Sequence, residues 1–194
     1  DTHRLRVFGD GDLQMQVLRK KPAELLSIIR GWYMKDWYRY LWEDGFEFSA
    51  VAGSDLPMLE YIISTDDGDL VNEKDEMWPS KSEQPEDWQE EHEMRTIYRN
   101  CTVLHYAALL RDVHLCKLIL DHSRFQEAGA HCKLPYICCN GGWTALHIAC
   151  AIGVKDICLL LLRQPKFTAV WDRDADNLTA LHYAMERGHP EVIS

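Results

Sequence analysis

The sequence lacks an apolar stretch long enough to cross a bilayer as a helix. Such a helix needs about 18 consecutive apolar residues, whereas the run at 159–162 is closed by Arg163 and Pro165. The chain also lacks an excess of basic residues, since its formal net charge is −10. Proteins that bind DNA or RNA present a basic surface. We therefore expect no membrane insertion and no nucleic-acid partner.

Motifs of the common catalytic sites are missing as well. The chain has no P-loop, no G-x-S-x-G and no G-x-G-x-x-G, the patterns that hold phosphates, nucleophilic serines and dinucleotides. Acidic pairs such as Asp66 and Asp67 lie in a charged stretch, where we expect them to be solvated. The sequence therefore predicts no catalytic residue, no cofactor and no enzymatic activity.

Cysteine is present in an odd number, seven in 194 residues. A chain of this length can build a core without disulfides, which indicates reduced thiols and a cytoplasmic or nuclear location. His131, Cys132, Cys138 and Cys139 lie close enough in sequence to suggest zinc, but their spacing departs from the C-x2-C pattern. We expect ordinary thiols there and no bound metal.

A six-residue phrase occurs three times in the chain. It reads TVLHYA at 102–107, TALHIA at 144–149 and TALHYA at 179–184, with histidines 42 and 35 residues apart. A phrase repeated at a period near 33 is typical of stacked repeats, and this one resembles the ankyrin repeat. The resemblance implies that each threonine caps a helix, and that each histidine bonds back to it and across to the next repeat. These structural repeat residues are Thr102, His105, Thr144, His147, Thr179 and His182.

The same resemblance predicts individual helices and turns. The unit that begins at Gly142 is expected to hold helices over about 145–151 and 155–163. Asn100 and Asn177 stand where the family has glycine, and asparagine tolerates left-handed backbone better than most residues. Residues 101–194 are thus read as ankyrin repeats with an incomplete last one, which implies a longer parent protein or a disordered end.

The resemblance weakens toward the N-terminus. Residues 45–63 read as a degenerate repeat, with Phe48 in place of the histidine. Residues 1–44 read as N-terminal capping helices or a diverged repeat, because terminal repeats are commonly atypical. The sequence therefore predicts an all-α ankyrin-repeat solenoid of about four to five helix pairs, with short β-hairpin connections and one long acidic insertion.

That insertion spans residues 64–100. It holds twelve acidic and four basic residues, a net charge of −8. One interpretation is a solvated, partly disordered loop. The other uses Trp78 and Trp88 as apolar anchors that dock the segment onto a surface, including a surface of this same chain.

The resemblance also implies where a partner binds. In ankyrin-like stacks the hairpin tips and the exposed side of the first helices form a concave face. The residues implied are Tyr98, Arg99, Leu109, Leu110, Asn140, Trp143, Ala151, Ile152, Asp176, Leu178, Glu186 and Arg187. Leu109, Leu110, Trp143 and Ile152 are expected to form an exposed apolar patch, which either binds a partner or is covered by the insertion.

We therefore expect a non-catalytic, monomeric protein–protein interaction module that binds a protein or peptide on its concave face. The acidic charge favours a basic partner. The alternative is a regulatory ankyrin domain of a larger enzyme or channel, with the insertion as an intramolecular lid. A minor alternative is a cage for methylated lysine built from Trp143, Trp171 and Asp174.

Overall fold

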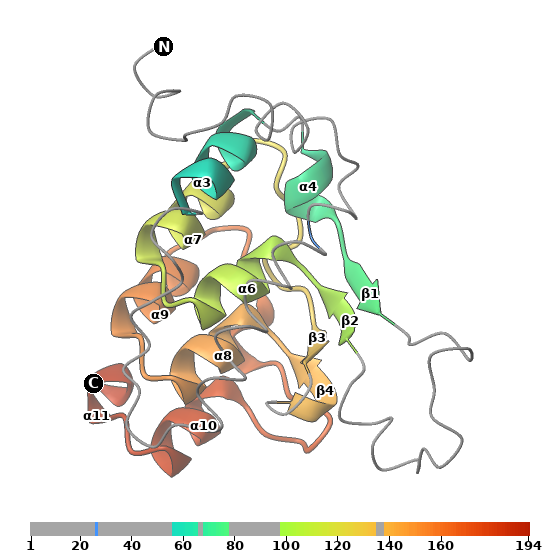
Figure 1. Ribbon diagram of the computed structural model, residues 1–194. Coiled ribbons are helices and arrows are strands. Elements are labelled where there is room, and N and C mark those ends of the chain that lie inside the picture. Colours follow the sequence, from blue (N-terminus) through green and yellow to red (C-terminus); the bar gives the residue numbers. More distant parts are fainter. Residues whose placement is uncertain (1–25, 27–55, 66–67, 78–97, 135–137) are drawn as a thin grey trace, which may run out of the picture.

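The computed structural model describes residues 26, 56–65, 68–77, 98–134 and 138–194. Helices and strands in these residues are arranged in separate layers (Figure 1). They are α3 (Leu56–Thr65), α4 (Asp69–Asn72), β1 (Asp75–Met77), β2 (Tyr98–Cys101), α6 (Val103–Leu109), α7 (Val113–Asp121), β3 (Cys132–Leu134), β4 (Cys138–Trp143), α8 (Ala145–Ala151), α9 (Lys155–Leu162), the 3-10 helix η2 (Ala169–Trp171), α10 (Ala180–Glu186) and α11 (Pro190–Ile193).

The helices form a repeat solenoid. In the described chain they come as the pairs α6–α7, α8–α9 and α10–α11, and each pair packs on the next. The first helices, α6, α8 and α10, make one row and the second helices, α7, α9 and α11, make another, with the strands on the far side of the first row (Figure 1). The helical solenoid that the sequence predicts is confirmed at this level.

The strands build one antiparallel sheet in the order β1-β2-β3-β4. Met77 pairs with Tyr98, Arg99 with Lys133, and Cys132 with Trp143. Asn100 and Asn177 have φ angles of 52° and 63°. The prediction that asparagine fills the left-handed positions of these turns is confirmed.

Part of the segment expected to be a solvated loop is instead built into the fold. Leu70 and Val71 of α4 are buried, and β1 pairs with β2. Asn72 donates to the carbonyl of Arg124 at 2.9 Å. Two apolar side chains and one amide are enough to dock a short helix on the loop after α7, so the solvated-loop expectation is wrong for residues 68–77.

Several other expectations fall on residues outside the described part of the chain. They are the capping helices expected in 1–44, of which the structure describes Leu26 alone, the beginning of the degenerate repeat at 45–55, and the two tryptophans of the insertion, which lie within 78–97. Only α3 corresponds to the expected upstream repeat, at the position of its second helix.

The repeated phrase starts each first helix as the resemblance implies. Thr102, Thr144 and Thr179 are the N-cap residues of α6, α8 and α10, each in a capping box with the histidine three residues later. The backbone N–H of each threonine donates to that histidine's Nδ1, at 3.0, 3.2 and 3.1 Å respectively. The helix expected over 145–151 is observed at those bounds, and the following one ends at Leu162.

Two of the three histidines also connect neighbouring units. Because Nδ1 accepts a hydrogen bond, Nε2 carries the proton and donates. His105 Nε2 donates to the carbonyl of Ala130 at 3.1 Å, and His147 Nε2 donates to the carbonyl of Leu178 at 3.3 Å. Both carbonyls belong to the loop that leads into the next unit, so each ring ties its helix start to the layer that follows.

Burial keeps these two rings neutral. Desolvation lowers the pKa of His105 to about 4, although the hydrogen bond to Ala130 opposes it. Desolvation likewise lowers the pKa of His147, against the hydrogen bond to Leu178. A neutral imidazole with one donor and one acceptor is the form that both bonds require.

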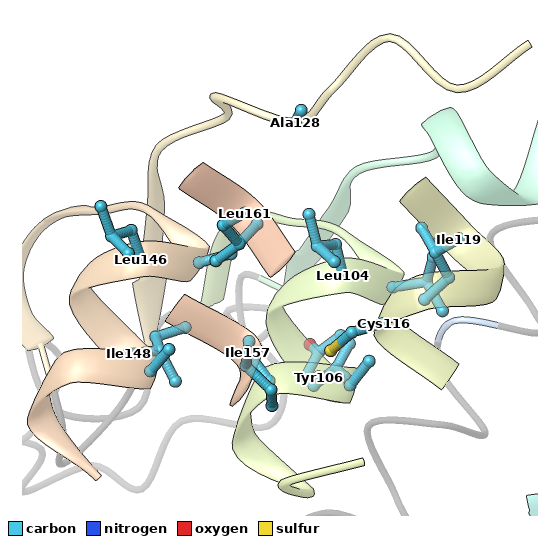
Figure 2. Packing of buried hydrophobic residues seen from close by; sticks show 14 of the residues in the cluster. Leu104, Tyr106, Cys116, Ile119, Ala128, Leu146, Ile148, Ile157 and Leu161 are labelled. Carbon is cyan, nitrogen blue, oxygen red and sulfur yellow. The ribbon is translucent and has the colours of Figure 1, made fainter. Parts of the chain in front are cut away.

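The apolar core lies between the two helix rows. Figure 2 shows Ile157 and Leu161 of α9 inserted between side chains of α8 and α6, among them Ile148 and Tyr106. All four side chains are fully buried. One continuous core therefore runs from unit to unit, and α9 packs against the first helices of two layers.

The α10–α11 unit has an open outer face. Leu181, Met185 and Ile193 are 42%, 57% and 47% exposed. The residues at the corresponding positions of the two preceding units are buried; they are Leu104, Ala108 and Cys116, then Leu146, Cys150 and Cys158. His182 is exposed too, and no described residue accepts from its Nε2. We call Leu181, His182, Met185 and Ile193 the end face.

The difference between His147 and His182 predicts unequal effects of one substitution. Glutamine can replace histidine in a capping box but is not shaped to span to the next layer. We expect His147→Gln to lower the free energy of unfolding by about 0.5–1.5 kcal/mol, because the hydrogen bond between layers is lost and the Leu178 carbonyl keeps only its bond from the Asp174 N–H. His182→Gln, the matched control, should cost less than about 0.5 kcal/mol. Urea denaturation measures both, and equal losses would contradict the bridging role.

The neutral histidines also predict acid sensitivity. Unfolded histidine takes up a proton below about pH 6.5, whereas folded His105 resists protonation down to about pH 4. Stability is therefore full above pH 6.5 and is lost as the pH falls toward 4, by about 2 kcal/mol between pH 7 and pH 5 for this one ring. Denaturation at several pH values tests this, and a His105→Gln variant should show a shallower decline.

Candidate functional site

A buried carboxylate organises the loop of the third unit. Asp174 is only 7% exposed. Its Oδ1 accepts from the backbone N–H groups of Asp176 at 3.0 Å and Leu178 at 2.9 Å. Its Oδ2 accepts from Trp143 Nε1 at 3.0 Å and from the Tyr183 hydroxyl. Four donors from three segments of the chain therefore converge on one side chain.

These bonds keep Asp174 ionised despite its burial. Desolvation favours the protonated acid, but the four hydrogen bonds, the strongest from Tyr183, outweigh it and hold the pKa below its ordinary value. Desolvation and then the bond to Asp174 raise the pKa of Tyr183. The rings of Trp143 and Tyr183 also touch, with centroids 4.5 Å apart. We call Trp143, Asp174 and Tyr183 the carboxylate cluster.

The cluster brings two hairpin tips together. The backbone N–H of Ala175 donates to the carbonyl of Gly141 at 3.2 Å. Gly142 has a φ of 85°, and a Cβ there would lie 2.9 Å from the Ala175 nitrogen. Only glycine allows this approach, so the family glycine at 142 is required by packing as well as by backbone conformation.

His131 links the same loops, a structural role that the sequence did not predict. His131 Nδ1 lies 2.8 Å from the carbonyl of Gly142, and Nε2 lies 2.9 Å from Asp172 Oδ2. No repeat pattern marks this residue, because it lies in the irregular stretch between two units. Its nitrogens are engaged with these loops and Cys132 is buried. Among the described residues, no group of three or more His, Cys, Asp or Glu side chains could hold a metal ion.

The predicted partner-binding residues differ in exposure. Asn140, Asp176, Glu186 and Arg187 are exposed, whereas Leu110, Ala151, Ile152 and Leu178 are half-buried. Tyr98 and Arg99 lie on β2, beside β1 and β3. The exposed members stand at the tips of the hairpins and at the end of α10.

Leu109 and Trp143 correct the expected apolar patch. Both are 2% exposed. Trp143 points into the carboxylate cluster, because its indole N–H has a partner there, and Leu109 joins the core of α6. The expectation of an exposed patch is wrong for these two residues. The methyl-lysine cage fails for the same reason, since Trp143 is already enclosed.

The exposed part of the tips is polar. Asn140 Nδ2 donates to Asp176 Oδ1 at 2.7 Å, which joins two successive tips at the surface. Asp176 sits two residues after Asp174, so the buried carboxylate fixes the backbone that carries it. The arrangement can present hydrogen-bonding and charged groups to a second molecule in fixed positions, which lowers the entropic cost of binding.

A separate pocket lies between α3 and α7, away from the hairpin tips. It has a volume of about 560 Å³ and is lined in part by Ile63, His114, Lys117 and Asp121. Lys117 and Asp121 form an ion pair with each other.

Comparison with known families follows the same units. A family model described as ankyrin repeats, in three copies, matches residues 50–169 and 104–194, which together are most of the chain. No curated protein matches the chain. Among the described residues, no helix has both the length and the apolar character that crossing a membrane requires.

The carboxylate cluster predicts a large effect for a small substitution. In Asp174→Asn the amide can still accept from two backbone N–H groups, but its NH2 faces the Trp143 N–H, which can only donate. We expect a loss of about 2–3 kcal/mol in the free energy of unfolding. Asp172→Asn makes the same change at a half-exposed site, where we expect less than about 1 kcal/mol. Urea denaturation compares them, and a similar loss in both would contradict the role of the cluster.

Proposed function

Because the chain belongs to the ankyrin repeat family, we propose that it is a protein-binding module whose partner is a polypeptide held on the concave face. Ankyrin repeats are generally protein–protein interaction modules, and ankyrin repeat domains are typically non-catalytic. We propose the same for this chain, with the hairpin tips and the ends of the first helices as the contact surface.

The observation that carries this proposal is that the hairpin tips combine a buried, hydrogen-bonded carboxylate with exposed polar side chains. Asp174 is buried and bonded to four donors, whereas Asp176 and Asn140 beside it are exposed. A rigid base with polar groups in water suits recognition, because little ordering is needed when a partner arrives. Residues of a solvated loop would not require such a frame.

The chemistry of the surface favours a partner with basic and polar groups. Asp176 and Glu186 supply carboxylates, and Leu110 and Ile152, half-buried at the ends of α6 and α8, supply apolar contact. The net charge of −10 adds a long-range field that raises encounter rates with cationic partners. Arg187 lies next to Glu186, so we propose a peptide of mixed charge with a basic excess.

Other features stay proposals with this one. They are a stack of about four to five helix pairs, an acidic insertion over 64–100, a monomeric state, and a cytoplasmic or nuclear location. The alternative function, in which the insertion acts as a lid, depends on 66–67 and 78–97, which lie outside the described residues. No described contact favours that alternative.

A pair of charge reversals tests the proposed surface. Asp176 lies at a tip, and Asp156 is an equally exposed aspartate on α9, in the row of second helices. We expect Asp176→Lys to weaken binding of a basic peptide pool by about threefold or more, because an attractive charge becomes repulsive. Asp156→Lys, with the same change in net charge, should bind nearly as the native chain does.

Fluorescence anisotropy provides the measurement. The probes are two labelled peptide pools of equal length and mixed sequence, one with a basic and one with an acidic excess. Selective binding of the basic pool, reduced only by the tip variant, supports the proposal. Equal binding by all three proteins, or a stronger effect of Asp156→Lys, would place the contact elsewhere.

A further inference from the structure

Two thiols touch inside the second helix pair. Cys150 on α8 and Cys158 on α9 have their Sγ atoms 3.8 Å apart, and both are free. Gly153 lies between them in sequence, in the turn that reverses the chain. A disulfide needs a sulfur–sulfur distance of about 2.05 Å, so the two atoms are within a small side-chain rotation of bonding distance.

The neighbouring units show what is particular to this pair. Counting from the capping threonines, the equivalent positions hold Ala108 and Cys116 in the preceding unit. In the following unit they hold Met185 and Ile193. In each unit these two positions lie on the first and the second helix. Among these three units, only the α8–α9 unit has cysteine at both of them.

All five described cysteines are buried; Cys150 and Cys158 are 5% and 4% exposed, and Cys101, Cys116 and Cys132 are 0%, 0% and 2% exposed. The pair differs from Cys116 in its hydrogen bonding. The hydrogen bond from Cys150 lowers the pKa of Cys158, and burial raises the pKa of Cys116. A thiolate is the reactive form, so these directions favour Cys158 as the nucleophile of the pair and make Cys116 less reactive than a free thiol.

We propose that Cys150 and Cys158 are an oxidation site, at which a peroxide converts the two thiols into a disulfide within the α8–α9 pair. The Cys158 thiolate attacks one oxygen of hydrogen peroxide, and the O–O bond breaks. The departing hydroxide takes up a proton to give water, and Cys158 becomes a sulfenic acid.

The second step uses the thiol that is already in contact. Cys150 sulfur attacks Cys158 sulfur, the S–O bond breaks, and the hydroxide leaves with the proton of Cys150 as a second water. Two thiols are oxidised and one peroxide is reduced to two waters. The product links residues eight apart across the turn, which restricts the unfolded chain more than the folded one.

Peptide mapping after oxidation tests the proposal. The reduced, folded protein is exposed to hydrogen peroxide, its remaining thiols are alkylated under denaturing conditions, and the chain is digested. Trypsin cuts after Lys155, between the two cysteines, and chymotrypsin cuts after Trp143, which separates Cys150 from Cys138 and Cys139. We expect a linked pair of peptides that dithiothreitol separates, and a thermal midpoint raised by about 5 °C.

Matched serine variants give the control. Cys158→Ser should abolish the linkage and the thermal shift, whereas Cys116→Ser, at the same position of the preceding unit, should keep both. Cys150→Ala serves as a second variant if Cys158→Ser does not fold. Recovery of both peptides fully alkylated from oxidised native protein, or Cys158 oxidised further without a link, would overturn the proposal.

Discussion

The stack depends on the hydrogen bonds of a neutral imidazole that is buried between two layers. In α6 and α8 the ring accepts from the N–H of its own capping threonine and donates to a carbonyl of the following loop. One side chain therefore starts a helix and positions the layer after it. An aliphatic residue could fill the volume but would leave the threonine N–H unpaired and, next to α6, the Ala130 carbonyl as well. Apolar packing then adds strength to a geometry that hydrogen bonds have already defined.

The carboxylate cluster applies the same logic to the loops. Asp174 accepts from an indole, a phenol and two backbone amides, so it fixes the loop between η2 and α10. Residues just outside it, such as Asp176, then face water from a firm base. If the tips bind a partner as proposed, fold stability and recognition are divided between neighbouring residues of one turn.

The sequence predicted the structure correctly where a residue's role depends on its immediate neighbours in the chain. Threonine at the helix start, histidine three residues later and asparagine in left-handed turns follow from local chemistry, and all are observed. Leu109 and Trp143 could not be assigned correctly, because their burial depends on which segment packs against them. The contacts of His131 could not be predicted, since its partners, Gly142 and Asp172, come from two other loops. The contact of Cys150 with Cys158 could have been inferred by aligning the units, because their positions correspond to facing positions on the two helices of each unit.

The end face makes the solenoid unequal along its axis. Within the described residues, α8–α9 has a packed layer on both sides, whereas α10–α11 has one on the side of α8–α9, and His182 and Met185 are exposed. In a structure stabilised by nearest-neighbour contacts, a layer packed on one side opens more readily than a layer packed on both. In a chain of these 194 residues, amide hydrogens of α10 and α11 should then exchange with solvent sooner than those of α8.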